Sequence, residues 1–90
     1  MITLTEHARD KLLKELQRLG IMEQTITQAI NNPDELLYDV LRNRFVAINW
    51  KHKIAIIYEK INDDILIITV IYSSRLKEVV NKRRQDGRWI

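Results

Sequence analysis

The chain has 90 residues, of which 46% are hydrophobic and 30% are charged, so we expect a single folded domain over residues 1–90. It has no cysteine, which excludes disulfides and cysteine-based zinc sites. The net charge of +3 is uneven, because residues 75–90 hold six Lys/Arg and two Asp/Glu, whereas residues 1–74 hold nine and ten. A basic excess confined to the last sixteen residues favours an anionic partner.

The beginning of the chain reads MITLTEH, without the basic stretch and apolar run of a secretory signal. The longest nearly apolar runs are about eight residues, whereas a membrane-spanning helix needs about 20. We therefore expect a cytoplasmic protein with no membrane partner.

Two helices are predicted before residue 34. The first follows Thr5, a suitable N-cap, and ends at Gly20. Its apolar residues recur at helical spacing: Ala8, Leu12, Leu16 and Leu19. The second runs from about Met22 to Asn31 and ends before Pro33, because proline disfavours helix in the residue that precedes it.

Four strands follow and form a predicted antiparallel meander. β-branched residues, which favour strands, are abundant here: most of the fourteen isoleucines lie in the second half of the chain. The strands are Leu36–Val40, Phe45–Trp50, Ile54–Lys60 and Ile65–Tyr72. The last of them is apolar on both faces, so both faces of the sheet need a cover. The second cover could be a C-terminal helix, a second copy of the chain or a partner protein.

Residues 75–84 can form that helix, with Leu76, Val79 and Val80 on its inner side. The predicted fold is therefore α+β, with two N-terminal helices packed on a four-stranded antiparallel meander and a short basic C-terminal helix.

Catalysis by a metal or a cofactor has little support in the sequence. His7 and His52 are far apart and belong to no HxH or HExxH pattern, and Asp63-Asp64 reads as a solvated turn. We expect no metal and no cofactor.

Phosphate binding has the most support. The C-terminal segment supplies the side chains that suit phosphate oxygens: Arg75, Lys82, Arg83, Arg84 and Arg88. Trp89 either stacks on a base or anchors the segment in the core. A base and several cations suffice to cleave RNA without metal when a 2′-hydroxyl attacks its neighbouring phosphate. The alternative is a charged helix that only keeps the protein soluble.

The segments LTEHARDKL, LGI, INNPDE, ITVIYSSR and KRRQDGRW, in this order, give the chain a resemblance that spans nearly its whole length. It resembles a family of small prokaryotic proteins grouped with the BrnT-like toxins in the RelE/ParE toxin superfamily. The resemblance implies two N-terminal helices on an antiparallel sheet and a role as toxin in a two-gene toxin–antitoxin module. RelE-like members cut mRNA, often on the ribosome, without metal, whereas ParE-like members inhibit DNA gyrase.

Active sites in this superfamily draw on basic residues, an acid or a histidine, and an aromatic residue. The candidate catalytic residues are His7, Glu59, Tyr72, Arg75 and Arg84. The candidate nucleic-acid-binding residues are Arg44, Lys82, Arg83, Arg88 and Trp89. In this scheme arginines neutralise phosphate, His7 or Glu59 takes the 2′-hydroxyl proton, and Tyr72 or Trp89 stacks on a base.

The leading hypothesis is thus a RelE-like protein that binds mRNA or ribosome-associated RNA, with a cognate antitoxin as a second partner. Whether it cleaves RNA, as a metal-independent endoribonuclease, stays open. The alternatives are a non-catalytic interaction domain that forms a homodimer or docks a partner through its sheet, and a gyrase-directed inhibitor.

Overall fold

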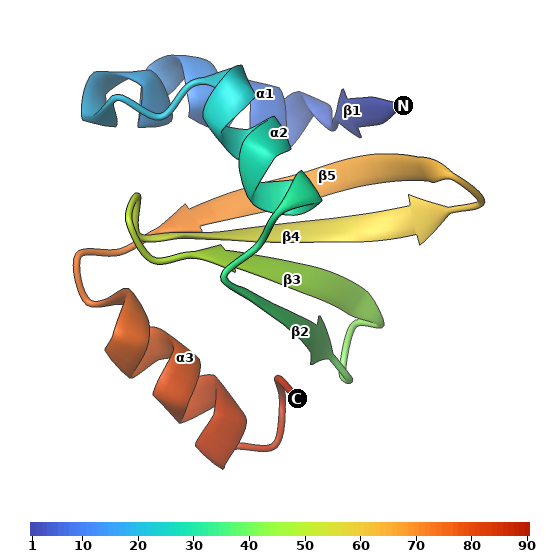
Figure 1. Ribbon diagram of the computed structural model, residues 1–90, viewed down its shortest axis with the longest axis vertical. Helices are drawn as coiled ribbons and strands as arrows, with labels where there is room; N and C mark the ends of the chain where they lie inside the picture. Colours follow the sequence, from blue (N-terminus) through green and yellow to red (C-terminus); the bar gives the residue numbers. More distant parts are fainter.

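A five-stranded mixed sheet, in the order β1-β5-β4-β3-β2, is the middle layer of the computed structural model, which describes all residues, 1–90 (Figure 1). Four strands form an antiparallel meander: β2 (Glu35–Asp39), β3 (Arg44–Asn49), β4 (Ile54–Ile61) and β5 (Asp64–Tyr72). The fifth, β1 (Ile2–Leu4), pairs with β5 in parallel. The α+β class and the meander are confirmed, and the parallel strand is an addition to the predicted arrangement.

The hairpin turns explain why the meander forms where it does. Each contains one residue in the left-handed region: Asn43, Lys53 and Asn62 have φ of 57°, 57° and 56°. Asparagine tolerates this conformation better than most residues with a side chain. The Asn62-Asp63 turn joins Ile61 directly to its partner Asp64, which fixes the register of the longest hairpin.

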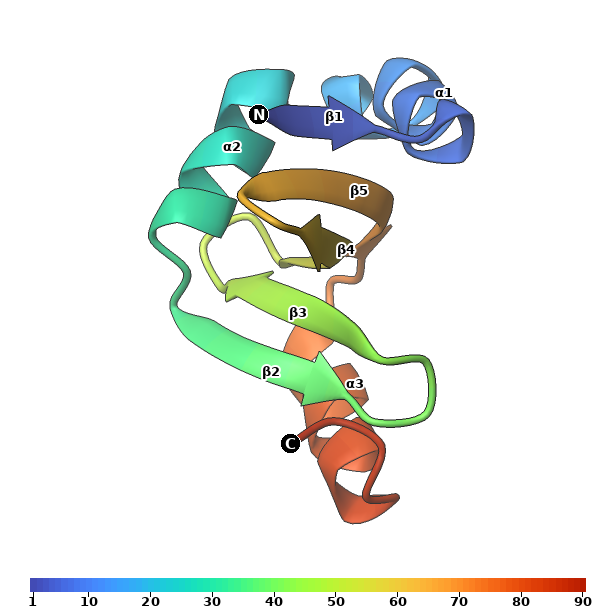
Figure 2. The same ribbon diagram turned by 90° about the vertical axis from the view of Figure 1, so that its right-hand side faces the viewer.

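Helices cover both faces of the sheet, as the two perpendicular views show (Figures 1 and 2). One face is covered by α1 (Glu6–Lys14), the 3₁₀-helix η1 (Leu16–Leu19) and α2 (Glu23–Asn31). The other face is covered by α3 (Leu76–Gln85) and the residues after it. Neighbouring residues of β4 therefore enter different cores: Ile56 packs under α1 and α2, and Ile57 packs under α3.

The two-sided apolar pattern of the strands is thus satisfied within one chain. The C-terminal helix, the first of the three predicted covers, lies on the second face, with Leu76 and Val80 buried against the sheet. The feature that suggested a homodimer through this face is accounted for without a second copy.

The first helix departs from its prediction. It ends at Lys14 and is followed by η1, whereas the apolar spacing predicted a helix up to Leu19. Gly20 does end this region in the left-handed conformation, with φ 77°, and donates to the carbonyl oxygen of Gln17 at 3.1 Å. The tighter turn lets both Leu16 and Ile21 reach the core, where each is at most 1% exposed.

The last three residues, 88–90, lie along the outer edge of β2. Tyr38 and Ile90 exchange two backbone hydrogen bonds of 3.0 Å, and Val40 donates to the carbonyl oxygen of Arg88 at 3.0 Å. The C-terminal segment, residues 86–90, therefore closes an edge that would otherwise present unpaired backbone groups. No helix of the structure is long and apolar enough to cross a membrane.

Candidate nucleic-acid interface

Asp39, at the end of β2, ties the C-terminal segment to the sheet. It is 1% exposed and is the only charged residue buried in the structure. Its Oδ1 accepts hydrogen bonds from the backbone N–H groups of Leu41 and Arg42, at 3.0 and 3.1 Å. Its Oδ2 accepts one from Trp89 Nε1 at 3.3 Å and forms an ion pair with Arg88 Nε at 3.4 Å. A buried carboxylate with these partners keeps its charge.

The pKa of Asp39 reflects this competition. Burial raises the pKa, because a charged carboxylate is less stable away from water. The hydrogen bonds from Arg42, Trp89 and Leu41 and the charge of Arg88 lower it and together outweigh burial. The pKa of Asp39 therefore lies below its ordinary value, and the carboxylate is ionised at neutral pH.

A row of charged side chains starts at this point and crosses three strands on the α3 side of the sheet. Arg44 lies opposite Asp39 in the β2–β3 ladder, and Arg44 Nε lies 3.3 Å from Oε2 of Glu59 on β4. Alternate residues of a strand share a face, so all three side chains lie on the same face as the α3-side core. We call Arg88, Asp39, Arg44 and Glu59 the charged row.

Helix α3 borders the charged row. Val79, Lys82 and Arg83 line a shallow hollow of about 260 Å³ on one flank of the helix. The guanidinium carbon of Arg83 lies 5.7 Å from the centre of the Trp89 ring, so Trp89 connects this flank to Asp39 and the row. Lys82 and Arg83 form no ion pair, which leaves both charges free for an anion.

The row and this flank of α3 together form one surface, which we call the α3–sheet surface. It contains five of the residues selected from the sequence: Arg44, Glu59, Lys82, Arg83 and Arg88. Its exposed members reach solvent, since the side chains of Glu59, Arg44 and Arg88 are 37%, 27% and 24% exposed. A carboxylate beside several cations can act on a bound phosphodiester.

Trp89 takes the anchoring role. It is 2% exposed, lies in the α3-side core and donates to Asp39. This burial leaves no free ring face, so the expectation that Trp89 stacks on a base is corrected.

The remaining sequence candidates lie elsewhere. His7, on α1, contacts Thr69 on β5, with 3.2 Å between Nε2 and Oγ1. Tyr72 ends β5 and is 39% exposed. Arg75 and Arg84 stand at opposite ends of α3, about 13 Å apart along its axis. The five residues selected for catalysis therefore do not form one constellation, and only Glu59 lies on the α3–sheet surface.

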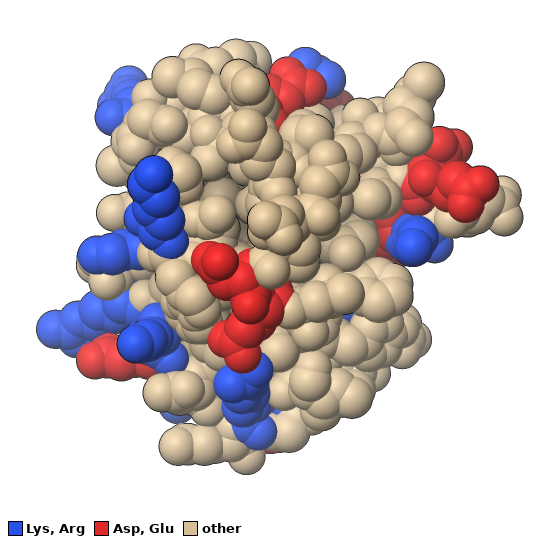
Figure 3. All heavy atoms as spheres, viewed as in Figure 1, with Lys and Arg blue, Asp and Glu red and all other residues tan.

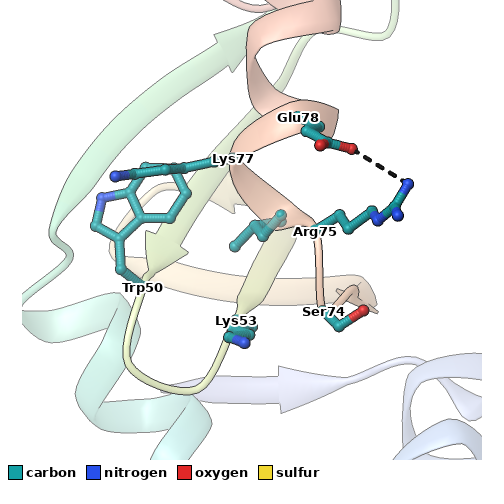
Figure 4. Close-up of a pocket in the computed structure, with 7 residues that line it drawn as sticks. Trp50, Lys53, Ser74, Arg75, Lys77 and Glu78 are labelled. Atoms are coloured by element: carbon teal, nitrogen blue, oxygen red, sulfur yellow. Dashed lines mark ion pairs between the residues drawn. The ribbon is translucent and has the colours of Figure 1, made fainter.

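A second hollow, of about 430 Å³, opens on the other side of α3 (Figure 4). Trp50 and Lys53 line it from the β3–β4 turn, and Ser74 to Glu78 line it from the start of α3. In Figure 3, lysine and arginine side chains gather over this part of the molecule, with acidic ones between them. We call this site the Trp50 hollow.

The sequence analysis missed three residues of the Trp50 hollow, Trp50, Lys53 and Lys77, and it also missed Asp39. The run Trp50-Lys51-His52-Lys53, an aromatic residue followed by basic ones in a turn, was the available signal for the hollow. Asp39 gave no signal, because its partners come from the chain end.

No group of three His, Asp or Glu side chains that could hold a metal ion occurs in the structure. No protein-family model matches this chain, and neither a curated protein nor a solved structure matches it.

Proposed function

We propose that this chain binds single-stranded RNA on the α3–sheet surface and cleaves it without metal, as a RelE-like member of the RelE/ParE toxin superfamily. The observation that carries the proposal is the charged row, in which Glu59 lies open to solvent directly beside Arg44. The resemblance to BrnT-like toxins noted in the sequence supports the same conclusion, and a cognate antitoxin would be its protein partner.

The binding step rests on four cations. Lys82 and Arg83 project from α3, Arg44 comes from β3, and Arg88 comes from the C-terminal segment. Each bound phosphate replaces counterions around the RNA, which is the main source of affinity in such complexes. The guanidinium groups also give two parallel hydrogen bonds to one phosphate, which positions the backbone.

The cleavage step assigns the base to Glu59. Its carboxylate takes the proton of a 2′-hydroxyl, and the oxygen attacks the adjacent phosphorus. The P–O5′ bond breaks, and the leaving 5′-oxygen takes a proton from water, giving a 2′,3′-cyclic phosphate and a 5′-hydroxyl. Arg44 and Arg88 stabilise the negative charge that builds up on the phosphoryl oxygens.

Two variants separate binding from cleavage. Glu59→Gln keeps the shape of the side chain but removes the base, so cleavage of a fluorescent ten-nucleotide RNA in EDTA should fall about 100-fold or more. Its RNA affinity, measured by fluorescence anisotropy, should stay the same or rise, because a negative charge is lost. Lys82→Ala/Arg83→Ala should instead weaken RNA binding about tenfold.

Lys11→Ala/Lys14→Ala is the matched control, because it removes two positive charges from exposed positions of α1 on the opposite side of the sheet (Figure 1). It should leave both binding and cleavage unchanged. Equal loss of affinity in the two double variants would reduce the binding to net charge alone. Full cleavage by Glu59→Gln would remove this residue from the mechanism, and failure of the wild-type chain to bind RNA would overturn the proposal.

A further inference from the structure

The Trp50 hollow has no part in the proposed cleavage, and its composition calls for a ligand. Seven residues line it, of which only Trp50 and Leu76 are hydrophobic. Lys53 and Lys77 line it too, are exposed, and form no ion pair. An indole between two unpaired ammonium groups combines an aromatic platform with charges for an anion.

The hollow is held in shape by contacts between its walls. The backbone N–H of Trp50 donates to Asp34 Oδ2 at 2.8 Å, and Lys53 N–H donates to the carbonyl oxygen of Trp50 at 3.3 Å. Ser73 N–H donates to the carbonyl oxygen of Lys53 at 3.1 Å, which ties the turn to the segment before α3. Trp50 and Lys53 are therefore fixed relative to α3 before any ligand arrives, which lowers the entropic cost of binding.

The carboxylates near the hollow oppose an anion only weakly. Glu78 lies 3.8 Å from Arg75, and the two side chains are 72% and 78% exposed. An ion pair this exposed contributes little, so Arg75 stays available for a phosphate. The lining of the hollow carries three positive charges against one negative charge: Lys53, Arg75 and Lys77 against Glu78.

A path leads from this hollow to the α3–sheet surface. Beyond Trp50, a further hollow of about 390 Å³ runs along α3 past Lys77 and Asn81 to Arg84. Arg84 there is bound to Glu35 at 2.6 Å. Because Arg83 and Arg84 are consecutive, the two flanks of α3 meet at its C-terminal end. A single strand could follow α3 from one surface to the other.

We propose that the Trp50 hollow holds one nucleotide of a single-stranded RNA, with its base against the indole of Trp50 and its phosphate between Lys53 and Lys77. This proposal rests on the proposed function for the identity of the RNA. The volume of the hollow lies within the range of small-ligand sites, about 300–1,000 Å³. The hollow presents a flat ring and few other apolar groups, which suits a base better than the aliphatic anchor of a bound peptide.

The test uses the fluorescence of Trp50 and the affinity for a decamer of uridylate. The decamer should quench the tryptophan emission of the wild type, and Trp50→Leu should abolish the quenching. Lys53→Ala/Lys77→Ala should weaken binding about tenfold, and because both side chains are exposed the core stays intact. Lys11→Ala/Lys14→Ala is again the control and should bind as the wild type does.

The outcomes separate this inference from the proposed function. Binding of RNA that is lost in Lys82→Ala/Arg83→Ala but unchanged in Lys53→Ala/Lys77→Ala, without quenching, would overturn the inference and leave the function in place. Quenching by adenosine monophosphate, in a protein that cleaves no RNA, would support the hollow and count against the function. Stronger quenching by a decamer of glutamate than by the RNA would identify an acidic-peptide site and overturn the inference.

Discussion

Asp39 shows how one residue joins parts of the chain that are distant in sequence. It stands at the end of β2, and two of its partners, Arg88 and Trp89, lie about fifty positions later. The other two partners are N–H groups of the turn that leads into β3, so the carboxylate also shapes that turn. Because Arg44 lies opposite Asp39 in the ladder, a change at Asp39 would reach both the C-terminal segment and the charged row.

Asp39→Asn should lower the free energy of unfolding by about 2–3 kcal/mol at pH 7, because a buried charge-assisted network loses its charge. The amide would also point its NH₂ group at donors on one side. Urea unfolding of the two proteins measures the difference. Asp63→Asn, in the exposed β4–β5 turn, is the control and should stay within about 0.5 kcal/mol of the wild type.

The same pair of proteins has a pH dependence of known sign. The pKa of Asp39 is lower in the folded chain than its ordinary value, so its stabilisation is present above about pH 4 and is lost as the pH falls through the folded-state value. The difference between wild type and Asp39→Asn should therefore be constant from pH 5 to 7 and should shrink below pH 4. A difference that grew on acidification would contradict the assignment of a lowered pKa.

At the scale of elements, the C-terminal segment acts as an extra edge strand with one deep anchor. Trp89 fills the α3-side core while its neighbours bond to the edge of β2. Trp89→Ala should cost about 3–5 kcal/mol of unfolding free energy, since it leaves a large cavity and removes a hydrogen bond to Asp39. Thermal or urea unfolding measures this. Ile90→Ala, at a residue 68% exposed, should change stability by less than about 0.5 kcal/mol.

The elements differ in how far the sequence reveals them. Both helices with a long apolar stripe and all four strands of the meander were predicted to within one or two residues at most ends, because their periodicity and turn residues are local signals. Strand β1 has three residues, and its pairing with β5 spans more than sixty positions, so no local pattern marks it. The change from α1 to η1 keeps the apolar spacing, so it also escapes a periodicity argument.

The candidate site was predictable only as far as residue types go. The basic residues of the C-terminal segment were found from their clustering, but the sequence placed Arg84 and Arg88 in equivalent roles. In the structure Arg84 binds Glu35 and Arg88 binds Asp39, on different parts of β2. Arg44 and Glu59 are fifteen positions apart, and the β3–β4 register brings them together. Register depends on the whole sheet, so local patterns do not determine it.

Over the whole molecule, the charge is divided between the two sides of the sheet. The basic excess of residues 75–90 lies with α3, and α1 on the other side carries lysines and acids close together, as in the hollow lined by His7, Asp10, Lys11, Lys14 and Glu15. Figure 1 shows these two layers separated by the sheet. An anionic strand is therefore attracted to one side of the molecule in particular, which favours correct orientation during encounter.

This division predicts the salt dependence of RNA binding. Four phosphate contacts on the α3–sheet surface give a slope of about −3 in a plot of log affinity against log salt, at about −0.7 per contact with a single strand. Lys82→Ala/Arg83→Ala should reduce the steepness by about 1.4, because two contacts are lost. Lys11→Ala/Lys14→Ala removes the same net charge from the other side and should keep the wild-type slope. Anisotropy titrations between 50 and 200 mM salt measure all three, within the range where such effects are clear. The same slope in all three proteins would place the RNA away from α3.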